Sequence, residues 1–202
     1  MERTRPLAFA DLDPDPFRQF GVWYEQARAE GVPYPEACTV ATSSRDGRPS
    51  ARMVLLKEFD TRGFVVATNY ESRKGRELAD NPRAALLFHW QPLGRQVRIG
   101  GGVERLSASE SEAYFRTRPL ASRLAAWASP QSRPLADRVE LERLYAEAES
   151  RHGDDPPLPP HWGGFRLLPD AYEFWEHGDD RLHDRLRYER DATGWSPARL
   201  AP

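Results

Sequence analysis

The stretch A-C-T-V-A-T-S-S-R-D-G-R-P-S-A-R-M-V-L-L-K-E-F-D-T-R-G-F-V-V-A-T, residues 37–68, decides the fold. It predicts three strands, at 37–42, 50–57 and 63–68. Arg45-Asp46-Gly47 signals a hairpin between the first two strands, and a second turn follows at 60–63. Strands joined by such short turns are antiparallel, because a parallel pair needs a long crossover. The stretch therefore favours an antiparallel barrel over a doubly wound sheet.

The rest of the chain adds further strands and several helices. Cap signals at 13–16 predict a helix at about 17–30, and Ser72 predicts a short helix that ends at Asn81-Pro82. A helical insertion is expected at about 109–151, opened by a capping box of Ser109 and Glu112. More strands are expected at 84–90, 96–106, 164–168, 171–175, 184–189 and 195–200. We expect one domain over 1–202, mainly β with peripheral helices (α+β), roughly eight antiparallel strands, and a C-terminal strand region at about 162–202.

Composition excludes several classes of protein. The formal net charge is −2 at 30% charged residues, which gives no electrostatic case for binding nucleic acid or an anionic membrane. Cys38 is the single cysteine, so no internal disulfide is possible. No apolar run approaches the ~20 residues of a membrane span, and acids and prolines near the N-terminus replace the apolar core of a signal peptide. The histidines show no metal-ligand spacing. We expect a cytoplasmic protein without metal, nucleic acid or membrane.

The segment R-L-H-D-R, residues 181–185, is the strongest candidate for a ligand-binding strand. Arg181, His183 and Arg185 alternate with Leu182 and Asp184, and alternate side chains of a strand share one face. On this interpretation the two guanidiniums and the imidazole face one ligand, and Leu182 points into the barrel.

Positive charge is carried almost entirely by arginine, since Lys57 and Lys74 are the two lysines of the chain. Lysine is a compact point charge that a planar guanidinium does not replace, so the two lysines can mark functional positions. Compositional drift that happened to leave two lysines is the competing interpretation. Arg73 and Lys74 begin the short helix, where backbone N–H groups and the helix dipole favour an anion. A phosphate site and a solvated helix start are both open at this point.

A second group of side chains of the kinds that bind phosphate lies on both sides of Pro119. Tyr114, Arg118 and Ser122 are spaced four residues apart, which places them on one face of a continuous helix. Pro119 interrupts that helix, so Ser122 is expected to cap the next one. An exposed helix face with a capping serine is the competing interpretation.

Taken together, these motifs resemble those of the pyridoxamine 5′-phosphate oxidase family. The matches run in order through nearly the whole chain after the first helix: R-M-V-L-L-K, T-N-x-x-S-R-K, N-P-R-A-A-L-L-F-x-W, R-Q-V-R-I-x-G, Y-F-x-x-R-P-x-x-S, A-W-A-S-x-Q-S, P-x-x-W-G-G-F-R, E-F-W, R-L-H-D-R and R-L-x-P. The closing R-L-H-D-R…R-L-x-P is the most specific of them.

The resemblance implies an FMN-binding split β-barrel that forms a homodimer with FMN between the subunits. It implies oxidation of pyridoxine or pyridoxamine 5′-phosphate to pyridoxal 5′-phosphate, with O2 as acceptor and H2O2 as product. The flavin would carry the redox chemistry while the protein supplies position and charge. Carried over by motif, the FMN residues are Arg52, Met53, Val54, Leu55, Lys57, Thr68, Arg73, Lys74 and Gln96, completed by Gln131, Ser132, Trp175 and Arg185 from the partner subunit. The substrate residues are Lys57, Tyr114, Arg118 and Ser122 for the phosphate, and Arg181 and His183 over the pyridine ring as the catalytic pair.

Two departures and three alternatives accompany this resemblance. The region before Pro14 is short and lacks the basic, tyrosine-containing segment that many members fold over the substrate, and Ala67 stands where relatives often carry an aromatic. The alternatives are a phenazine-type flavin oxidase, a non-catalytic FMN or pyridoxal-phosphate carrier, and a deazaflavin-dependent reductase. Phenazine-type relatives lose the lysine that ends R-M-V-L-L-K, whereas Lys57 is present here.

Overall fold

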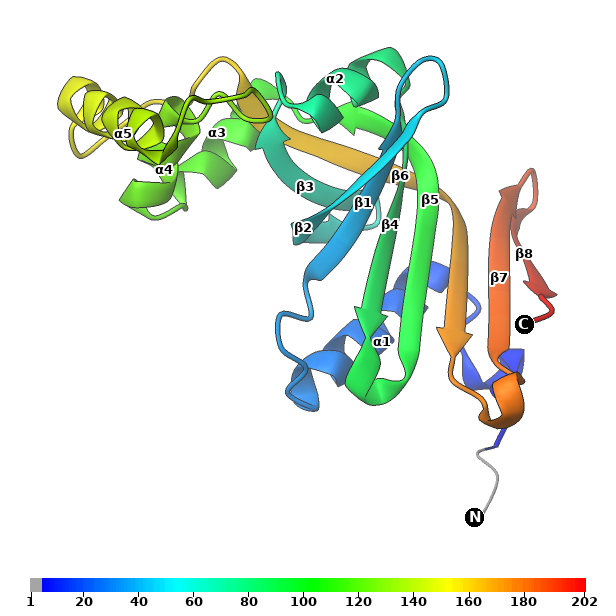
Figure 1. Ribbon diagram of the computed structural model, residues 1–202. Coiled ribbons are helices and arrows are strands. Elements are labelled where there is room, and N and C mark those ends of the chain that lie inside the picture. Colours follow the sequence, from blue (N-terminus) through cyan, green and yellow to red (C-terminus); the bar gives the residue numbers. More distant parts are fainter. Residues whose placement is uncertain (1–4) are drawn as a thin grey trace.

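Eight antiparallel strands form one continuous sheet in the computed structural model, which describes residues 5–202 (Figure 1). The expectation about the N-terminal segment falls partly on residues 1–4, outside that range. The strand order is β3-β2-β1-β4-β5-β6-β7-β8, and β3 also pairs with β6. This extra pairing closes six strands into a barrel and leaves β7 and β8 as an extension. The strands are β1 (Ala37–Ser43), β2 (Pro49–Asp60), β3 (Gly63–Asn69), β4 (Arg83–Trp90), β5 (Arg95–Arg105), β6 (Trp162–Glu176), β7 (Asp184–Asp191) and β8 (Gly194–Arg199).

The antiparallel barrel predicted from residues 37–68 is confirmed, and one strand is longer than expected. The two strands expected at 164–168 and 171–175 are the single 15-residue strand β6. Pro169 and Asp170, which fall between the two expected strands, lie where β6 bends and its register with β5 shifts at Gly100/Gly101. A Cβ on Gly101 would lie 2.0 Å from the Leu168 carbonyl oxygen, so the bulge needs glycine there.

The first two α-helices follow their cap signals. The helices are α1 (Pro16–Ala29), α2 (Arg73–Asp80), α3 (Ala108–Arg116), α4 (Leu120–Ala128) and α5 (Arg138–His152), with short 3₁₀ turns η1 (Phe9–Asp11), η2 (Gln91–Leu93) and η3 (Asp179–Arg181). Asp15 caps α1 with Pro16 in its first turn, and Ser72 caps α2 by accepting from the Gly75 N–H.

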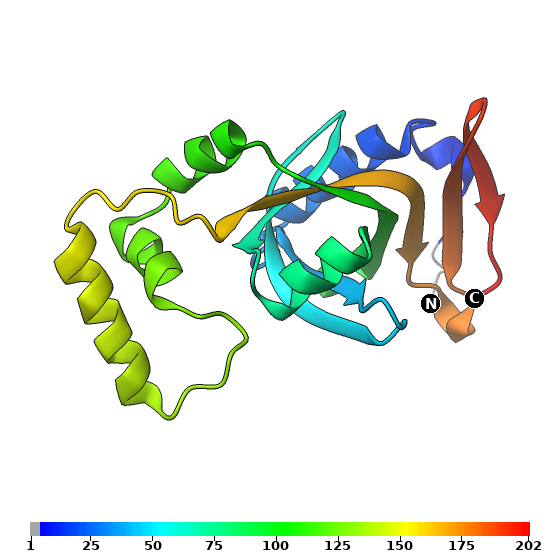
Figure 2. The same cartoon turned by 90° about the horizontal axis from the view of Figure 1, so that it is seen from above.

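Two of the predicted caps in the insertion were wrong. The capping box of α3 is made by Ser107 and Glu110, two residues earlier than the predicted pair. Pro119 precedes α4 and makes no side-chain cap, so Ser122 lies inside the first turn of that helix. Proline has no side-chain acceptor, so Pro119 starts α4 without a capping hydrogen bond from a side chain. Figure 2 shows α4 and α5 on one side of the barrel and the β7–β8 hairpin on the opposite side.

Helix α1 lies against the lower end of the barrel, and Phe20 is its anchor (Figure 1). The Phe20 side chain is fully buried and its ring lies 4.9–6.0 Å from four rings of strands β2, β3 and β4. Those rings belong to Phe59, Phe64, Phe88 and Trp90. The aromatic cluster therefore joins the helix to three strands that are separate in sequence.

Truncation of Phe20 should destabilise the fold strongly. Phe20→Ala is expected to lower the free energy of unfolding by about 3–5 kcal/mol, because it removes a buried ring and leaves a cavity. Val22→Ala on the same helix is the matched control, since Val22 is 47% exposed and its truncation should cost about 0.5 kcal/mol or less. Denaturant unfolding of both variants measures the difference, and equal losses would contradict this packing.

Candidate functional site

Three cations gather around the first turn of α2. Arg52 comes from β2, while Arg73 and Lys74 are the first two residues of the helix. Lys74 Nζ lies 2.8 Å from Gln131 Oε1, and the Thr68 hydroxyl lies 3.5 Å from the same oxygen. We call Arg52, Thr68, Arg73, Lys74 and Gln131 the cradle. Its cations and helix N-terminus together suit a phosphate.

The cradle brings Gln131 to Lys74 of its own chain. This differs from the expectation that Gln131 and Ser132 come from a partner subunit. Both residues lie in the loop after α4, where Ser132 holds a φ of +70°, in the left-handed region that is uncommon for a residue with a side chain. A strained backbone of this kind is typical of loops that clamp a ligand.

The surroundings of Lys74 change the pH range over which its side chain is charged. Burial, with a smaller contribution from the charge of Arg52, lowers the pKa of Lys74 to about 8. Because the ordinary value is 10.5, the ammonium is lost as the pH rises through about 8 instead of well above 10. The cradle is therefore less positive at alkaline pH.

Strand β2 presents two kinds of side chain. Met53 and Leu55 are 64% and 40% exposed on its outer face, whereas Val54 packs against the barrel core. The Val54 side chain therefore faces the core, and only its backbone is available to a ligand. The register of β2 with β3 shifts between Leu56 and Glu58, which places Lys57 at a β-bulge. A bulge changes the direction of a side chain, and the sequence carried no signal for it.

A second cationic cluster joins Lys57 to the helical insertion. Lys57 Nζ lies 6.0 Å from the centre of the Tyr114 ring, and the Arg118 guanidinium lies 4.6 Å from the centre of the Trp162 ring. The Tyr114 and Trp162 rings are stacked, 6.0 Å apart at 13°. Trp162 was not among the predicted site residues, although its motif was noted. Its ring contacts both the Tyr114 ring and the Arg118 guanidinium. We call Lys57, Tyr114, Arg118 and Trp162 the Trp162 cluster.

Arg118 has a hydrogen-bonding group that the described part of the chain leaves without a partner. Its Nη1 is buried and has no acceptor within residues 5–202. Burial also lowers the pKa of Arg118 from its ordinary value. A buried donor without an acceptor is costly, and an anionic ligand would remove that cost. Ser122 lies half-buried in the first turn of α4, which begins two residues after Arg118.

The remaining predicted residues lie at the other end of β6. Gln96, Trp175 and Arg185 are neighbours across β5, β6 and β7, since Gln96 pairs with Trp175 and Trp175 with Arg185. The His183 ring lies 4.7 Å from the Trp175 ring. We call Gln96, Trp175, His183 and Arg185 the Trp175 row.

The prediction that Arg181 and His183 share a strand face with Arg185 was wrong. Strand β7 begins at Asp184, and Arg181 ends the 3₁₀ turn η3 with a φ of +64°. Leu182 is 68% exposed and does not point into the barrel. The reason is local: Gly178 brings its backbone against Leu182, where a Cβ would lie 2.1 Å from the Leu182 carbonyl oxygen. Aspartate also tolerates the left-handed region, so Gly178 and Asp180 favour a turn over a strand.

The turn nevertheless orients His183. The Gly178 N–H donates to His183 Nδ1 at 3.2 Å, which assigns the proton of the neutral ring to Nε2. His183 can then donate from Nε2 to a ligand. Arg185 is held separately, because its Nε donates to the buried Glu173 carboxylate at 2.9 Å and its Nη1 to the Ala201 carbonyl at 2.8 Å.

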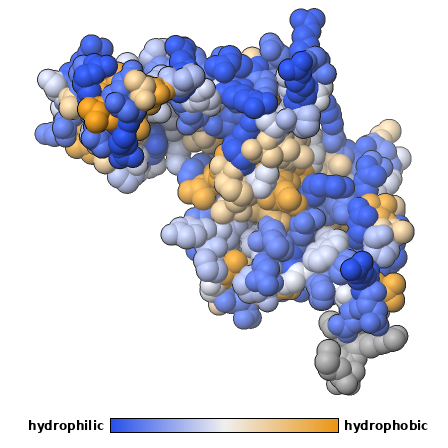
Figure 3. Space-filling view, in the orientation of Figure 1, coloured by the Kyte–Doolittle hydropathy of each residue, from blue (hydrophilic) through white to orange (hydrophobic). Residues whose placement is uncertain are grey.

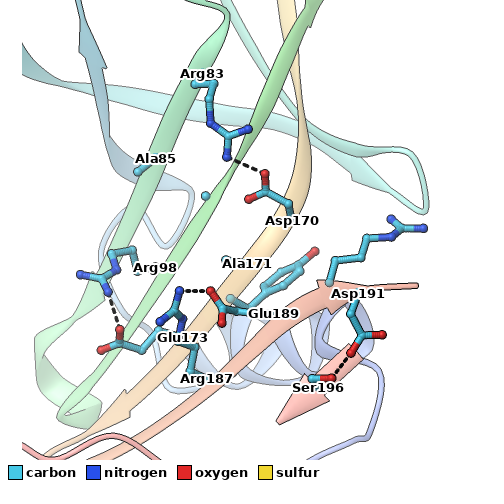
Figure 4. A pocket seen from close by; sticks show the side chains of 13 residues that line it. Arg83, Ala85, Arg98, Asp170, Ala171, Glu173, Arg187, Glu189, Asp191 and Ser196 are labelled. Atoms are coloured by element: carbon cyan, nitrogen blue, oxygen red, sulfur yellow. Dashed lines mark hydrogen bonds and ion pairs between the residues drawn. The ribbon is translucent and has the colours of Figure 1, made fainter. Parts of the chain in front are cut away.

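A hollow of about 780 Å³ lies on the outer face of β4 to β8, next to the Trp175 row (Figure 4). Three of its arginines form ion pairs across or along the strands. These pairs are Arg83 with Asp170, Arg98 with Glu173, and Arg187 with Glu189. The charges of the hollow are thus balanced within the chain, and it is a less suitable anion site than the cradle.

Two absences concern residues 5–202. No group of three or more His, Cys, Asp or Glu side chains in this range could hold a metal ion. No helix in the same range is both long enough and apolar enough to cross a membrane.

Comparison with known proteins identifies two matching segments. Residues 24–152 match the family described as pyridoxamine 5′-phosphate oxidase, and residues 162–202 match the pyridoxine 5′-phosphate oxidase C-terminal dimerisation region. The chain is 58% identical over 196 residues to a pyridoxine/pyridoxamine 5′-phosphate oxidase of Burkholderia vietnamiensis, covering 96% of this chain and 92% of that one.

Two solved structures show the same fold. PhzG from Burkholderia lata, in complex with tetrahydrophenazine-1-carboxylic acid, is similar with a TM-score of 0.91 at 36% identity, over 97% of this chain and 98% of that one. A pyridoxamine 5′-phosphate oxidase-related, FMN-binding protein from Nostoc punctiforme has a TM-score of 0.74 at 20% identity, over 95% of this chain and 100% of that one.

The pKa of Lys74 can be measured directly, because the chain has two lysines. With ¹³C-labelled lysine, the side-chain signal that disappears in Lys74→Arg should titrate at about pH 8. Phosphate affinity of the ligand-free protein should fall over the same range, and it should stay flatter in Lys74→Arg, whose guanidinium keeps its charge. A midpoint for that signal at 10.5 or above would contradict the burial of this ammonium.

Proposed function

This chain belongs to the pyridoxamine 5′-phosphate oxidase family, and we propose that it is an FMN-dependent oxidase of phosphorylated B6 vitamers. It would oxidise pyridoxine 5′-phosphate and pyridoxamine 5′-phosphate to pyridoxal 5′-phosphate, with O2 as acceptor and H2O2 as product. One observation carries the proposal: the chain has two separate cationic clusters, the cradle and the Trp162 cluster. A reaction between a phosphorylated cofactor and a phosphorylated substrate needs two such sites.

The cradle would hold the phosphate of FMN. Arg73 and Lys74 offer charged donors at the N-terminus of α2, where the helix dipole is positive, and Thr68 adds a hydroxyl. Met53 and Leu55 form an exposed apolar surface on the outer face of β2, against which a flat ring system would pack. When bound, FMN would supply the acceptor for the hydride that leaves the substrate.

The Trp162 cluster would hold the phosphate of the substrate. Arg118 Nη1 would find in a phosphate oxygen the acceptor that the chain itself does not supply. Lys57 reaches the same region from its bulge, and Ser122 adds a hydroxyl at the start of α4. Fixing the phosphate in this way positions the distant reacting carbon of the substrate.

Trp175, His183 and Arg185 of the Trp175 row would complete the site from a second copy of the chain. Trp162 and Trp175 lie at opposite ends of β6, which has 15 residues and is therefore about 45 Å long along its path. One flavin can contact both ends only if two chains are placed together. The match of residues 162–202 to a dimerisation region supports this arrangement. Figure 3 shows apolar side chains gathered on the barrel wall, a surface that a partner would cover.

The Trp175 row would then face the substrate ring. His183 can donate from Nε2 to a polar substituent of the ring, and Arg181 on the exposed turn η3 can lie over its face. Arg185 would contact the flavin, since Glu173 and the Ala201 carbonyl hold its guanidinium in place.

A phenazine-type oxidase is the second candidate, supported by the likeness to PhzG. The ligand named for that structure is a carboxylic acid without a phosphate. The Trp162 cluster favours the B6 vitamers, because a carboxylate on a fused ring does not explain a second phosphate-binding cluster that includes Lys57.

An oxidase assay tests the function. The purified protein with FMN should form pyridoxal 5′-phosphate and H2O2 in air from both phosphorylated substrates. Lys57→Ala should raise KM by the equivalent of about 1.5–3 kcal/mol, because a charged hydrogen bond to the phosphate is lost. Unphosphorylated pyridoxine is the control, and its turnover should change little.

Three results would contradict the proposal. Tight FMN binding without H2O2 would indicate a carrier, and absence of FMN binding would favour a deazaflavin reductase. A KM that does not respond to Lys57→Ala would remove Lys57 from the site.

Subunit complementation tests the shared site. Arg118→Ala alters the Trp162 cluster and Arg185→Ala alters the Trp175 row, next to opposite ends of β6, and each should lower kcat/KM strongly on its own. When the two variants are co-expressed, random pairing makes half of the dimers mixed, and each mixed dimer has one unaltered site. About a quarter of the parental activity should therefore return. A site built within one chain would recover nothing, so the absence of recovery would contradict the two-chain site.

A further inference from the structure

Glu77 is a buried carboxylate directly beneath the cradle. It lies on α2, one turn after Arg73, and its side chain is 7% exposed. Thr42 and Ser50 donate their hydroxyls to its Oε2, both at 2.5 Å. Arg73 Nε donates to Oε1 at 2.8 Å, and Arg52 Nη2 lies 3.5 Å from Oε2. Neither the sequence motifs nor the family resemblance assigned this residue a role.

The contacts of Glu77 determine how the two guanidiniums are presented. Arg73 uses its Nε for Glu77, while its side chain is 58% exposed, so its outer nitrogens remain available. Arg52 is more enclosed, and the same Thr42 and Ser50 hydroxyls that contact Glu77 also accept from its two Nη atoms, at 2.6 Å and 2.5 Å. One carboxylate and two hydroxyls therefore connect both arginines.

Electrostatics explain why a carboxylate is tolerated at an anion site. Arg52, Arg73 and Lys74 lie together at a helix N-terminus, where the dipole is also positive, so without a ligand they repel one another. Glu77 offsets part of this repulsion. Burial disfavours its charged form, but hydrogen bonds from Ser50, Thr42 and Arg73 and the charge of Arg52 outweigh burial and lower its pKa to about 2. Glu77 thus stays ionised at neutral pH.

We propose that Glu77 is a positioning residue for phosphate binding, which holds the Arg52 and Arg73 guanidiniums in their binding geometry before the ligand arrives. The inference rests on the proposed FMN site and goes further by naming what organises it. Glu77 does not touch the phosphate and acts through the two arginines. Preorganised donors bind more tightly because their ordering cost is already met.

Flavin titrations with FMN and riboflavin test the inference, because riboflavin lacks the phosphate. Glu77→Gln should weaken FMN binding about tenfold or more and leave riboflavin binding nearly unchanged, so the preference for FMN falls. Glu77→Asp keeps the charge but shortens the reach, and should show the same selective loss if Glu77→Gln does not fold. Asp80→Asn, an exposed carboxylate on the same helix, is the matched control.

A double-mutant cycle separates positioning from a general structural effect. In an Arg73→Ala background, Glu77→Gln should weaken FMN binding less than it does in the parent, because one of its two targets is already gone. FMN binding that is unchanged or tighter in Glu77→Gln, an equal loss for both flavins, or fully additive effects would overturn the inference. A parent protein that does not bind FMN would instead remove the proposed function, and this inference with it.

Discussion

The pairing of β3 with β6 is the constraint on which the rest of the structure depends. Six hydrogen-bonded strands close into a barrel through this one pairing, which removes two free sheet edges. It also places Trp162 beside Asn69, the last residue of β3. The Trp162 cluster and the cradle therefore become neighbours, because Thr68 of the cradle pairs with the residue that follows Trp162.

The length of β6 imposes a second constraint. The strand continues past the closed barrel and carries Trp175 to the sheet extension formed by β7 and β8. The Trp162 cluster lies at one end of β6 and the Trp175 row at the other, so the same strand keeps these two clusters apart in space. In the function proposed above, the reaction therefore depends on dimer formation. The shared site would also explain why Met53 and Leu55 are exposed apolar side chains on the outer face of the sheet.

Buried carboxylates organise the arginines in both halves of the molecule. Glu77 connects Arg52 and Arg73, and Glu173, 5% exposed, accepts from Arg98 and Arg185. A chain that uses arginine for nearly all of its positive charge must control where each planar fork points. At Arg73 the carboxylate engages Nε and leaves the outer nitrogens directed and available, which a surface ion pair between flexible side chains does not achieve.

The sequence alone determined the local structure and the identity of the candidate residues. Alternation and turn signals at 37–68 predicted the antiparallel barrel, caps at Asp15 and Ser72 placed two helices within a residue or two, and ordered motifs indicated the family. These features depend on neighbours a few residues apart. Only the tertiary structure decided the closure of β3 on β6, the bulge at Lys57, the turn that removes Arg181 and His183 from β7, and the contacts of Trp162 and Glu77. Each of these depends on contacts between distant segments, or on the energy of one backbone conformation over another, and residue spacing records neither.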